Sequence, residues 1–504
     1  MPKGFQGLIN EVVGYGMGAM LNRALGILIA CVYPILLNRD EYGRLDVIFS
    51  VPTLLAILFL IGLDSTLARF FYEGSDKTQR NRLVSTVFYT VIGITIPLVG
   101  ILLVASRPIA LWLYNDPRYV LYLRLVLVAM PFLLASRIQM ALFRFERRVH
   151  IYNLIVTFNL LLSALVGIAT ILIFHIGVAG ILIGFLIGHA GTVIIGILTS
   201  RSYLTELPMV RNLPELLGFG LPLMFSGVAF WFIGYVNRPM LAHQVSADDL
   251  GLFAIASGGV NVMALLLGSF RNAWQPYAFS IMGDENAGRV YGRTLTLFTF
   301  LGATIAVCGT LFAPQALLFI NLYTRKNWSG AASCVGPLAM GILLNAMYFV
   351  VQTGIYIARR TSVIAWTVGA AALSTLVFNS VLIPRFGIIG AAVATALGHL
   401  TALLLLYFLA QRIEPVPYQP GKLAFTLLLA SIVMTLDFHF QTHKLASDLL
   451  IKIALLLSYG TLLLSVRIIT LNDLRLIWNG IRSALGSIRN RVEADTEEVH
   501  ANRN

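Results

Sequence analysis

Several arginines lie inside long apolar stretches of this chain, where an ionised side chain costs about 2.5–3.5 kcal/mol and therefore implies a partner or water. Arg23 is the clearest case, because no acidic residue lies one helical turn away from it on either side. A guanidinium group forms paired hydrogen bonds with phosphate and carboxylate groups. We therefore predict that Arg23 faces an aqueous cavity that receives an anion.

Other polar residues in or at the ends of the apolar stretches are candidates for the same cavity. They are Asn22, Asp64, Arg69, Arg137, Asn237, Arg238, Arg271 and Gln275. For Arg69 and Arg271, extension of the side chain to the lipid headgroups is an equally good interpretation. Lys452 lies near the end of its apolar stretch, so we expect it to reach the headgroups and give it no further role.

The scarcity of acidic residues in these stretches bears on the kind of cargo. Exporters of cations and drugs need buried carboxylates that attract cations and carry protons. Here Asp64 is the clear candidate of the first half, and Asp437 lies at the edge of a stretch in the second half. This balance favours a cargo with phosphate or carboxylate groups. His189 and His399 are alternative proton carriers, although a histidine beside a glycine more often packs between helices.

The composition predicts a helical protein that crosses a membrane many times. Hydrophobic residues make up 58% of the chain and charged residues 12%, against about 45–50% and about 25% in soluble domains. The apolar residues form blocks of about 20 residues, the length of a membrane-spanning helix. We predict fourteen spans, at roughly 16–37, 47–71, 84–106, 119–142, 151–174, 177–199, 217–240, 250–272, 293–314, 331–356, 362–383, 387–410, 422–437 and 449–467.

The distribution of basic residues predicts the orientation. Most lysines and arginines outside the spans fall on the side that holds both termini, and cytoplasmic loops are the ones enriched in these residues. Both termini are therefore expected in the cytoplasm. The same distribution explains the net charge of +13 without a nucleic-acid partner, since no basic patch interleaved with exposed aromatic residues accompanies it.

The two halves of the chain resemble each other at a spacing of 210 residues. Gly177, Gly180, Gly188 and His189 match Gly387, Gly390, Gly398 and His399. A half-length repeat in a membrane protein suggests two helical bundles with a shared pathway between them. We expect an N-terminal lobe over 1–210 and a C-terminal lobe over 211–412. Two added spans over 413–470 and a cytoplasmic amphipathic helix and tail over 471–504 would follow.

Neither the loops nor the motifs indicate an enzyme. The loops are short, whereas polymerising or ligating membrane enzymes usually carry a sizeable outer loop, and there is no glycine-rich phosphate loop followed by lysine. We therefore predict a protein that is not an enzyme and needs no cofactor. In-vitro elongation of a glycan by the purified protein would support the alternative, a polysaccharide polymerase or ligase.

Several motifs resemble the Wzx-type polysaccharide flippases of the multidrug/oligosaccharidyl-lipid/polysaccharide exporter superfamily. These are Asn22-Arg-Ala-Leu-Gly26, Asp40-Glu-Tyr-Gly43, Gly62-Leu-Asp-Ser-Thr-Leu-Ala-Arg-Phe70, Tyr235-Val-Asn-Arg238, Asp249-Leu-Gly-Leu-Phe253 and Phe270-Arg-Asn-Ala-Trp-Gln-Pro-Tyr-Ala-Phe279. The resemblance covers about residues 10–465. It implies two six-helix lobes related by a pseudo-twofold axis, as in MATE transporters, with two extra C-terminal helices. It also implies that Arg23 lines the cavity.

The same resemblance implies transport of an undecaprenyl-diphosphate-linked oligosaccharide across the bacterial inner membrane. Partners in polysaccharide polymerisation and export are also expected. Many relatives have aspartate where this chain has Asn237, which argues against a carboxylate role in ion coupling there and leaves the coupling ion, H⁺ or Na⁺, open. A multidrug or cation antiporter and a lipid II flippase of the same fold are the alternatives.

Overall fold

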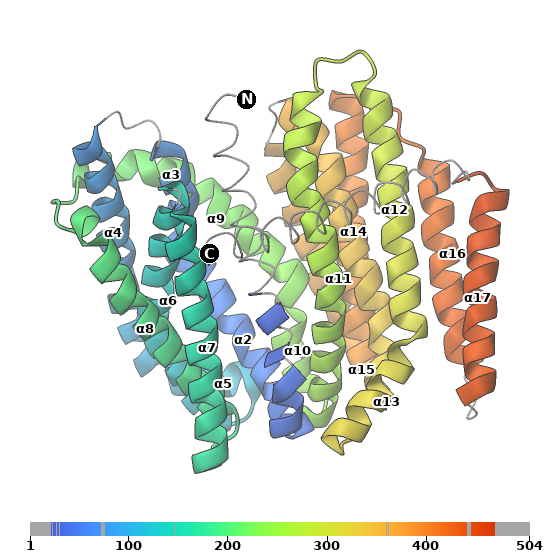
Figure 1. Ribbon diagram of the computed structural model, residues 1–504, viewed down its shortest axis with the longest axis horizontal. Helices are drawn as coiled ribbons and strands as arrows, with labels where there is room; N and C mark the ends of the chain where they lie inside the picture. Colours follow the sequence, from blue (N-terminus) through green and yellow to red (C-terminus); the bar gives the residue numbers. More distant parts are fainter. Residues whose placement is uncertain are drawn as a thin grey trace, which may run out of the picture.

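The protein is built from long helices arranged in two groups, as the computed structural model shows (Figure 1). The structure describes residues 22, 24–26, 28–29, 31–71, 76–146, 148–358, 360, 362–440 and 445–468. Within these residues every regular element is helical.

The N-terminal lobe holds α2 to α8. Their bounds are α2 Arg39–Leu60, α3 Leu63–Phe70, α4 Lys77–Val104, α5 Ser106–Tyr114, α6 Arg118–Phe145, α7 Val149–Phe174 and α8 Val178–Leu204. The span predicted over 47–71 is broken between α2 and α3. Ile61 and Gly62 adopt left-handed backbone angles there, with φ of 52° and 70°, which an α-helix cannot contain.

The C-terminal lobe holds α9 to α15, and two added helices follow it. The bounds are α9 Leu213–Tyr235, α10 Asn237–Gln244, α11 Ala247–Ser280, α12 Ala287–Leu311, α13 Ala313–Thr324, α14 Ala332–Ile357, α15 Ser362–Ile413, α16 Pro420–His439 and α17 Leu445–Ser465. Two single 3₁₀ turns, η1 (Val210–Asn212) and η2 (Ser329–Ala331), precede α9 and α14.

The helices confirm the predicted fold class. Within the described residues, 12 helices are long and apolar enough to cross a membrane. One of them, the 52-residue α15, is interrupted at Gly387 and combines two of the predicted spans. A further apolar helix covers Ala24–Leu36, in the region of the first predicted span. These helices are consistent with the fourteen spans expected.

The repeat seen in the sequence reappears in the backbone. Gly177, before α8, has φ 52° and ψ −126°, and Gly387, within α15, has φ 54° and ψ −129°. Glycine tolerates this region, which side chains of other residues rarely allow. The same sharp bend therefore joins two long helices in each lobe. A short helix also follows α4 in one lobe (α5) and α12 in the other (α13).

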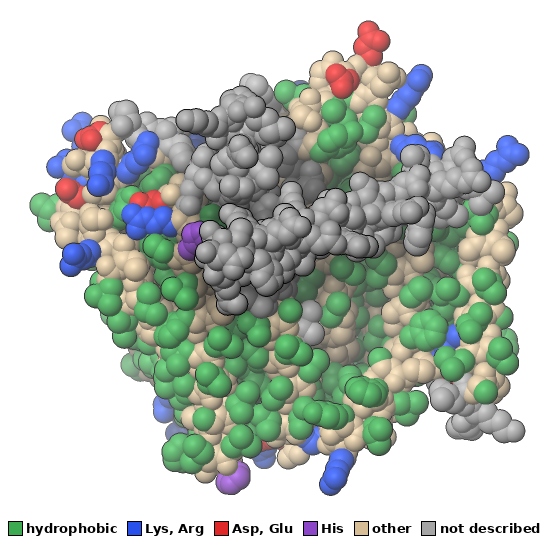
Figure 2. All heavy atoms as spheres, viewed as in Figure 1, with side chains coloured by type: hydrophobic (Ala, Val, Ile, Leu, Met, Phe, Trp, Pro, Cys, Tyr) green, Lys and Arg blue, Asp and Glu red, His purple; other side chains and the backbone are tan. Residues whose placement is uncertain are grey.

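The outer surface is that of a protein embedded in lipid. Figure 2 shows hydrophobic side chains over the sides of the molecule, while lysine, arginine and acidic side chains gather towards its two ends. Lys452, expected to reach the headgroups, is instead fully buried, with Nζ 3.0 Å from Asp448 Oδ2 and 3.0 Å from Gln315 Oε1. The lysine therefore ties α17 to α13 of the C-terminal lobe, and that expectation was wrong.

Candidate functional site between the two lobes

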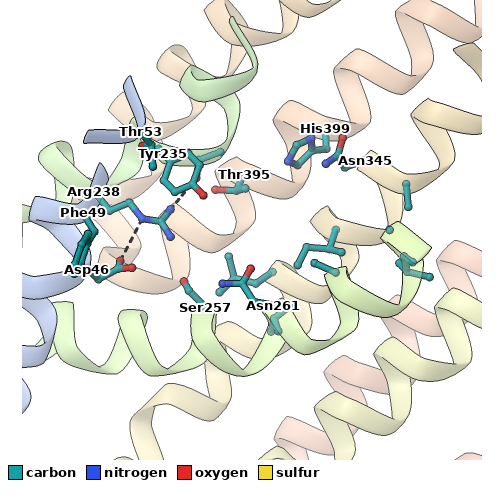
Figure 3. A pocket seen from close by; sticks show the side chains of 18 of the residues that line it. Asp46, Phe49, Thr53, Tyr235, Arg238, Ser257, Asn261, Asn345, Thr395 and His399 are labelled. Carbon is teal, nitrogen blue, oxygen red and sulfur yellow. Dashed lines mark hydrogen bonds and ion pairs between the residues drawn. The ribbon is translucent and has the colours of Figure 1, made fainter. Parts of the chain in front are cut away.

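A cavity of about 560 Å³ lies between the two lobes (Figure 3). The N-terminal lobe contributes wall residues from α2, α6 and α8, and the C-terminal lobe contributes them from α9, α10, α11, α14 and α15. Three of its wall residues are arginines, Arg137, Arg238 and Arg271, and one is an acid, Asp46. The cavity therefore carries a surplus of positive charge.

One side of α11 forms a continuous wall of this cavity. Its wall residues are Ser257, Val260, Asn261, Ala264, Leu267, Gly268 and Arg271. Steps of three and four residues place side chains on a single helix face. At a rise of about 1.5 Å per residue, this face extends roughly 21 Å from Ser257 to Arg271.

The floor of the cavity is an ion pair that joins the lobes. Arg238 Nε lies 3.2 Å from Asp46 Oδ2 of α2 (Figure 3). Its Nη1 donates hydrogen bonds to Gly234 O at 2.7 Å and to Asn237 Oδ1 at 2.9 Å. Asn237 itself donates to Thr395 Oγ1 at 2.9 Å. Arg238 is buried, so its charge is already satisfied by the protein.

Arg137 and Arg271 are in a different situation. Both side chains are exposed and line the cavity, and neither makes an ion pair or a hydrogen bond with another described residue. Asp64 of α3 is close enough to act electrostatically on Arg137 without pairing with it. Arg271 Cζ lies 4.4 Å from the ring centroid of Phe349, a cation–π contact that leaves its N–H groups free. One free guanidinium therefore comes from α6 of the N-terminal lobe and one from α11 of the C-terminal lobe.

Past the Asp46–Arg238 pair, the lobes contact each other at one end of the molecule. We call this end the sealed end and define it by Arg39, Gly43, Asp248, Gly251 and Lys326. Arg39 pairs with Asp248 at 3.1 Å, and a Cβ placed on Gly43 would come within 2.5 Å of the Gly251 nitrogen. Lys326 Nζ donates to the carbonyls of Pro34 and Ile35 at 3.1 and 3.0 Å. No side chain or water layer fits between α2 and α11 here.

The two lobes diverge away from the sealed end. Figure 1 shows the helices of the two groups closest near α10 and further apart towards the loop between α11 and α12. From the start of α11, which carries Asp248, Arg271 is 24 residues along the helix, or roughly 36 Å. The free arginines therefore lie nearer the end opposite the sealed one.

The structure brings three of the nine predicted cavity residues together in the wall: Arg137, Arg238 and Arg271. Five others are described and are not part of the wall. Asn22 accepts a hydrogen bond from Thr157 Oγ1 at 3.0 Å, Arg69 lies 4.7 Å from the centroid of Phe219, and Asn237 is buried behind Arg238. Asp64 of α3 is close enough to act electrostatically on Arg137, and Gln275 lies further along α11. Arg23 lies outside the described residues.

Neutral wall residues were missed by the sequence reasoning. Ser257, Asn261 and Asn345 carry no charge, so they do not stand out in an apolar stretch. For Ser257 and Asn261, their spacing from Arg271 on α11 is a signal that could have found them. Asp46 was also missed, because its partner Arg238 lies 192 residues away in the chain.

Comparisons with known proteins agree with this architecture. Residues 35–333 match the family described as "Polysaccharide biosynthesis protein". A protein of the Lsg locus of Haemophilus influenzae is 24% identical over 212 residues, which are 40% of this chain and 49% of that protein. An uncharacterized membrane protein of Methanocaldococcus jannaschii is 23% identical over 206 residues, 38% of this chain and 37% of that one. The matched segments span less than half the length of either relative.

Solved structures show the same fold. The lipid II flippase MurJ in an inward closed conformation has a TM-score of 0.70 at 13% identity, covering 89% of this chain and 98% of that one. An inward-facing multidrug resistance MATE family transporter of the MOP superfamily has a TM-score of 0.67 at 13% identity, covering 80% and 97%. The family match spans more than half of the chain. The protein shares the fold of these two structures and belongs to the polysaccharide biosynthesis protein family.

Proposed function

We propose that this protein is a flippase that moves an undecaprenyl-diphosphate-linked oligosaccharide across the bacterial inner membrane by alternating access. The observation that carries the proposal is the pair of free guanidinium groups, Arg137 and Arg271, on opposite sides of one cavity between the lobes. A diphosphate offers two charged groups that each accept paired hydrogen bonds from arginine. The two arginines would hold it from both lobes at once.

The depth of the arginines suits a lipid-linked anion. Arg271 lies roughly 36 Å along α11 from the sealed end, and Arg137, 19 residues into α6, lies roughly 28 Å along its helix. The hydrocarbon core of a bilayer is about 30 Å thick. These lengths support the proposal that both side chains lie near the headgroup level opposite the sealed end, where the diphosphate of a membrane lipid resides.

The sealed end supports a direction for the first step. With both termini in the cytoplasm, as the basic residues predict, the sealed end faces outward and the cavity would receive its cargo from the inner leaflet. The polyprenyl tail would remain in lipid through the gap between the lobes. Rocking of the lobes would then open the sealed end and expose the head group outside.

The electrostatics of the cavity argue against a cation or drug antiporter. Its one acidic wall residue, Asp46, is paired with Arg238. No free carboxylate therefore remains in the described wall to attract a cation. Asp64, outside the wall, is close enough to act on the charge of Arg137, but Arg271 has no such neighbour among the described residues and would repel a cation.

Deletion of the gene followed by mass spectrometry of membrane lipids tests the function. We expect a diphosphate-linked oligosaccharide to accumulate in the deletion strain. Expression of the unchanged protein in that strain should restore export. Arg137→Ala and Arg271→Ala should fail to restore export at normal protein levels. Arg107→Ala, which removes an exposed arginine outside the cavity wall, should restore it fully. Accumulation of no lipid-linked sugar would refute the proposal, and accumulation of lipid II would point to the related peptidoglycan precursor.

A further inference from the structure

The two repeat-related histidines have different surroundings. In the N-terminal lobe, Nδ1 of His189 lies 3.2 Å from Ser136 Oγ and 3.4 Å from Asn159 Nδ2, so the ring is held by its own lobe. His399 occupies the matching position 210 residues later and lines the cavity, yet it makes no hydrogen bond with a described residue. Only 9% of its surface is exposed. The two histidines are buried to the same extent, 8% and 9% exposed, but His189 is hydrogen-bonded within its own lobe and His399, in the cavity wall, is not hydrogen-bonded to a described residue.

His399 is one of four polar side chains on this side of the cavity that make no hydrogen bond with a described residue. Ser257 is only 8% exposed, and its Oγ has no hydrogen-bond partner. Asn261 and Asn345 also line the cavity and make no hydrogen bond among the described residues. Figure 3 shows Asn345 beside His399, with Ser257 and Asn261 on the neighbouring α11. Ser257 is the buried member of this cluster whose oxygen has no partner, which costs about 1–3 kcal/mol. Asn261 is exposed in the cavity and Asn345 is half-buried, so their amide groups are accessible to a polar ligand.

The chemistry of the cluster is that of an uncharged ligand rich in hydroxyl groups. The side chains of serine, asparagine and neutral histidine each offer both donor and acceptor capacity, which hydroxyl groups match in both directions. They come from three helices of one lobe, α11, α14 and α15. No arginine or acid belongs to the cluster. A phosphate would be better served by the free guanidinium groups elsewhere in the same cavity.

The cluster also lies deeper than the free arginines. Asn261 precedes Arg271 by ten residues on the wall-forming face of α11, or roughly 15 Å along the helix axis. The displacement is towards the sealed end. A head group whose diphosphate was held at Arg271 would therefore extend its sugars to the level of Asn261.

We propose that Ser257, Asn261, Asn345 and His399 form a sugar-binding subsite that recognises hydroxyl groups of the transported head group. This inference rests on the proposed flippase function, and it assigns the choice of sugar to the C-terminal lobe. Sites built to hydrogen-bond a hydroxyl group discriminate strongly against ligands that lack it. The subsite would therefore set which lipid-linked oligosaccharide the protein accepts.

Binding of two lipids to the purified full chain separates the sugar subsite from the diphosphate site. The probes are undecaprenyl diphosphate and the lipid-linked oligosaccharide isolated from cells lacking the gene. Asn345→Ala and His399→Ala should each weaken binding of the oligosaccharide lipid about tenfold, the effect of one lost hydrogen bond. Binding of undecaprenyl diphosphate should not change. Arg271→Ala should weaken binding of both lipids.

Two further variants guard against a purely structural effect. His189→Ala removes the matched, satisfied histidine and should not alter the ratio of the two affinities. His399→Gln keeps a hydrogen-bonding group that cannot carry a proton, and it should retain most of the binding and transport.

If Asn345→Ala and His399→Ala weaken binding of neither lipid, or of both lipids equally, the proposed sugar subsite is wrong. Loss of transport with unchanged binding in His399→Gln would overturn it in favour of a proton carrier. If Arg271→Ala leaves both affinities intact, the proposed function itself fails.

Discussion

Arg238 and Arg271 both line the cavity, but their surroundings give them different roles. Arg238 is buried and pairs with Asp46 at 3.2 Å, whereas Arg271 has its N–H groups free. The sequence placed both among the candidates because each carries a charge at the end of an apolar stretch. It could not separate them, since the difference depends on a carboxylate from α2 that only the folded chain brings close.

Substitution of Arg271 tests whether this arginine binds the diphosphate of the lipid. Arg271→Ala should weaken binding of undecaprenyl diphosphate by about ten- to a hundredfold, because hydrogen bonds to charged groups contribute roughly 1.5–3 kcal/mol. Arg271→Lys keeps the charge but loses the paired geometry, so an intermediate loss is expected. Titration of the lipid into purified protein measures both. Equal affinities for all three proteins would contradict a phosphate contact.

Substitution of Asp46 tests how much its ion pair with Arg238 contributes to stability. Asp46→Ala leaves the buried Arg238 without its carboxylate, and we expect a loss of about 2 kcal/mol in the free energy of unfolding. Asp248→Ala breaks the other pair between the lobes, where the Asp248 side chain is 55% exposed, and should cost less than about 1 kcal/mol. Thermal melting in detergent compares the two variants. A larger loss of stability for Asp248→Ala would show that the Asp46–Arg238 pair is not the stronger contact between the lobes.

At the scale of elements, the repeat was the most informative feature of the sequence. Gly177 and Gly387 were matched by spacing alone, and they have nearly the same backbone angles in the structure. The break at Ile61 and Gly62 was not predicted, because hydropathy does not report backbone angles. Lys452 was misjudged for a related reason. Asp448 lies one turn earlier on its own helix, and Gln315 of α13 and Asp437 of α16 complete its surroundings, which an apolar profile cannot show.

The segment between α13 and η2 is expected to control opening of the sealed end. Lys326 there donates to the last carbonyls of the helix that ends near Leu36, a favourable contact for a cation at a helix C-terminus. Lys326→Gln should weaken this contact and favour opening. Thr53→Cys introduces a thiol into the cavity wall. In the Lys326→Gln background this thiol should react several-fold faster than with Lys326 unchanged, when a membrane-impermeant thiol reagent is supplied at the sealed end.

The labelling experiment has direct controls. The free cysteines Cys31, Cys308 and Cys334 are first replaced by serine. Lys326→Arg keeps the positive charge and should leave the labelling rate of the Thr53 cysteine unchanged. If Lys326→Gln also leaves it unchanged, the segment does not hold the sealed end closed.

At the scale of the whole molecule, the sequence predicted the class of fold, and the structure shows how the two lobes create a site. The lobes contact each other where glycines allow α2 and α11 to meet, at Gly43 and Gly251. Further along, they leave the cavity of about 560 Å³. Hydropathy identified the helices, but the cavity wall depends on their relative tilt, which no single segment encodes. For that reason only three of the eight predicted residues that the structure describes are found in the wall.

The most direct test of the central claim is translocation by the purified protein in proteoliposomes. A lipid-linked oligosaccharide placed in one leaflet is followed by its accessibility to a glycosidase on the other side. The unchanged protein should transfer the lipid, and the correctly folded Arg137→Ala/Arg271→Ala double variant should not. Transfer by the double variant at the rate of the unchanged protein would contradict this expectation.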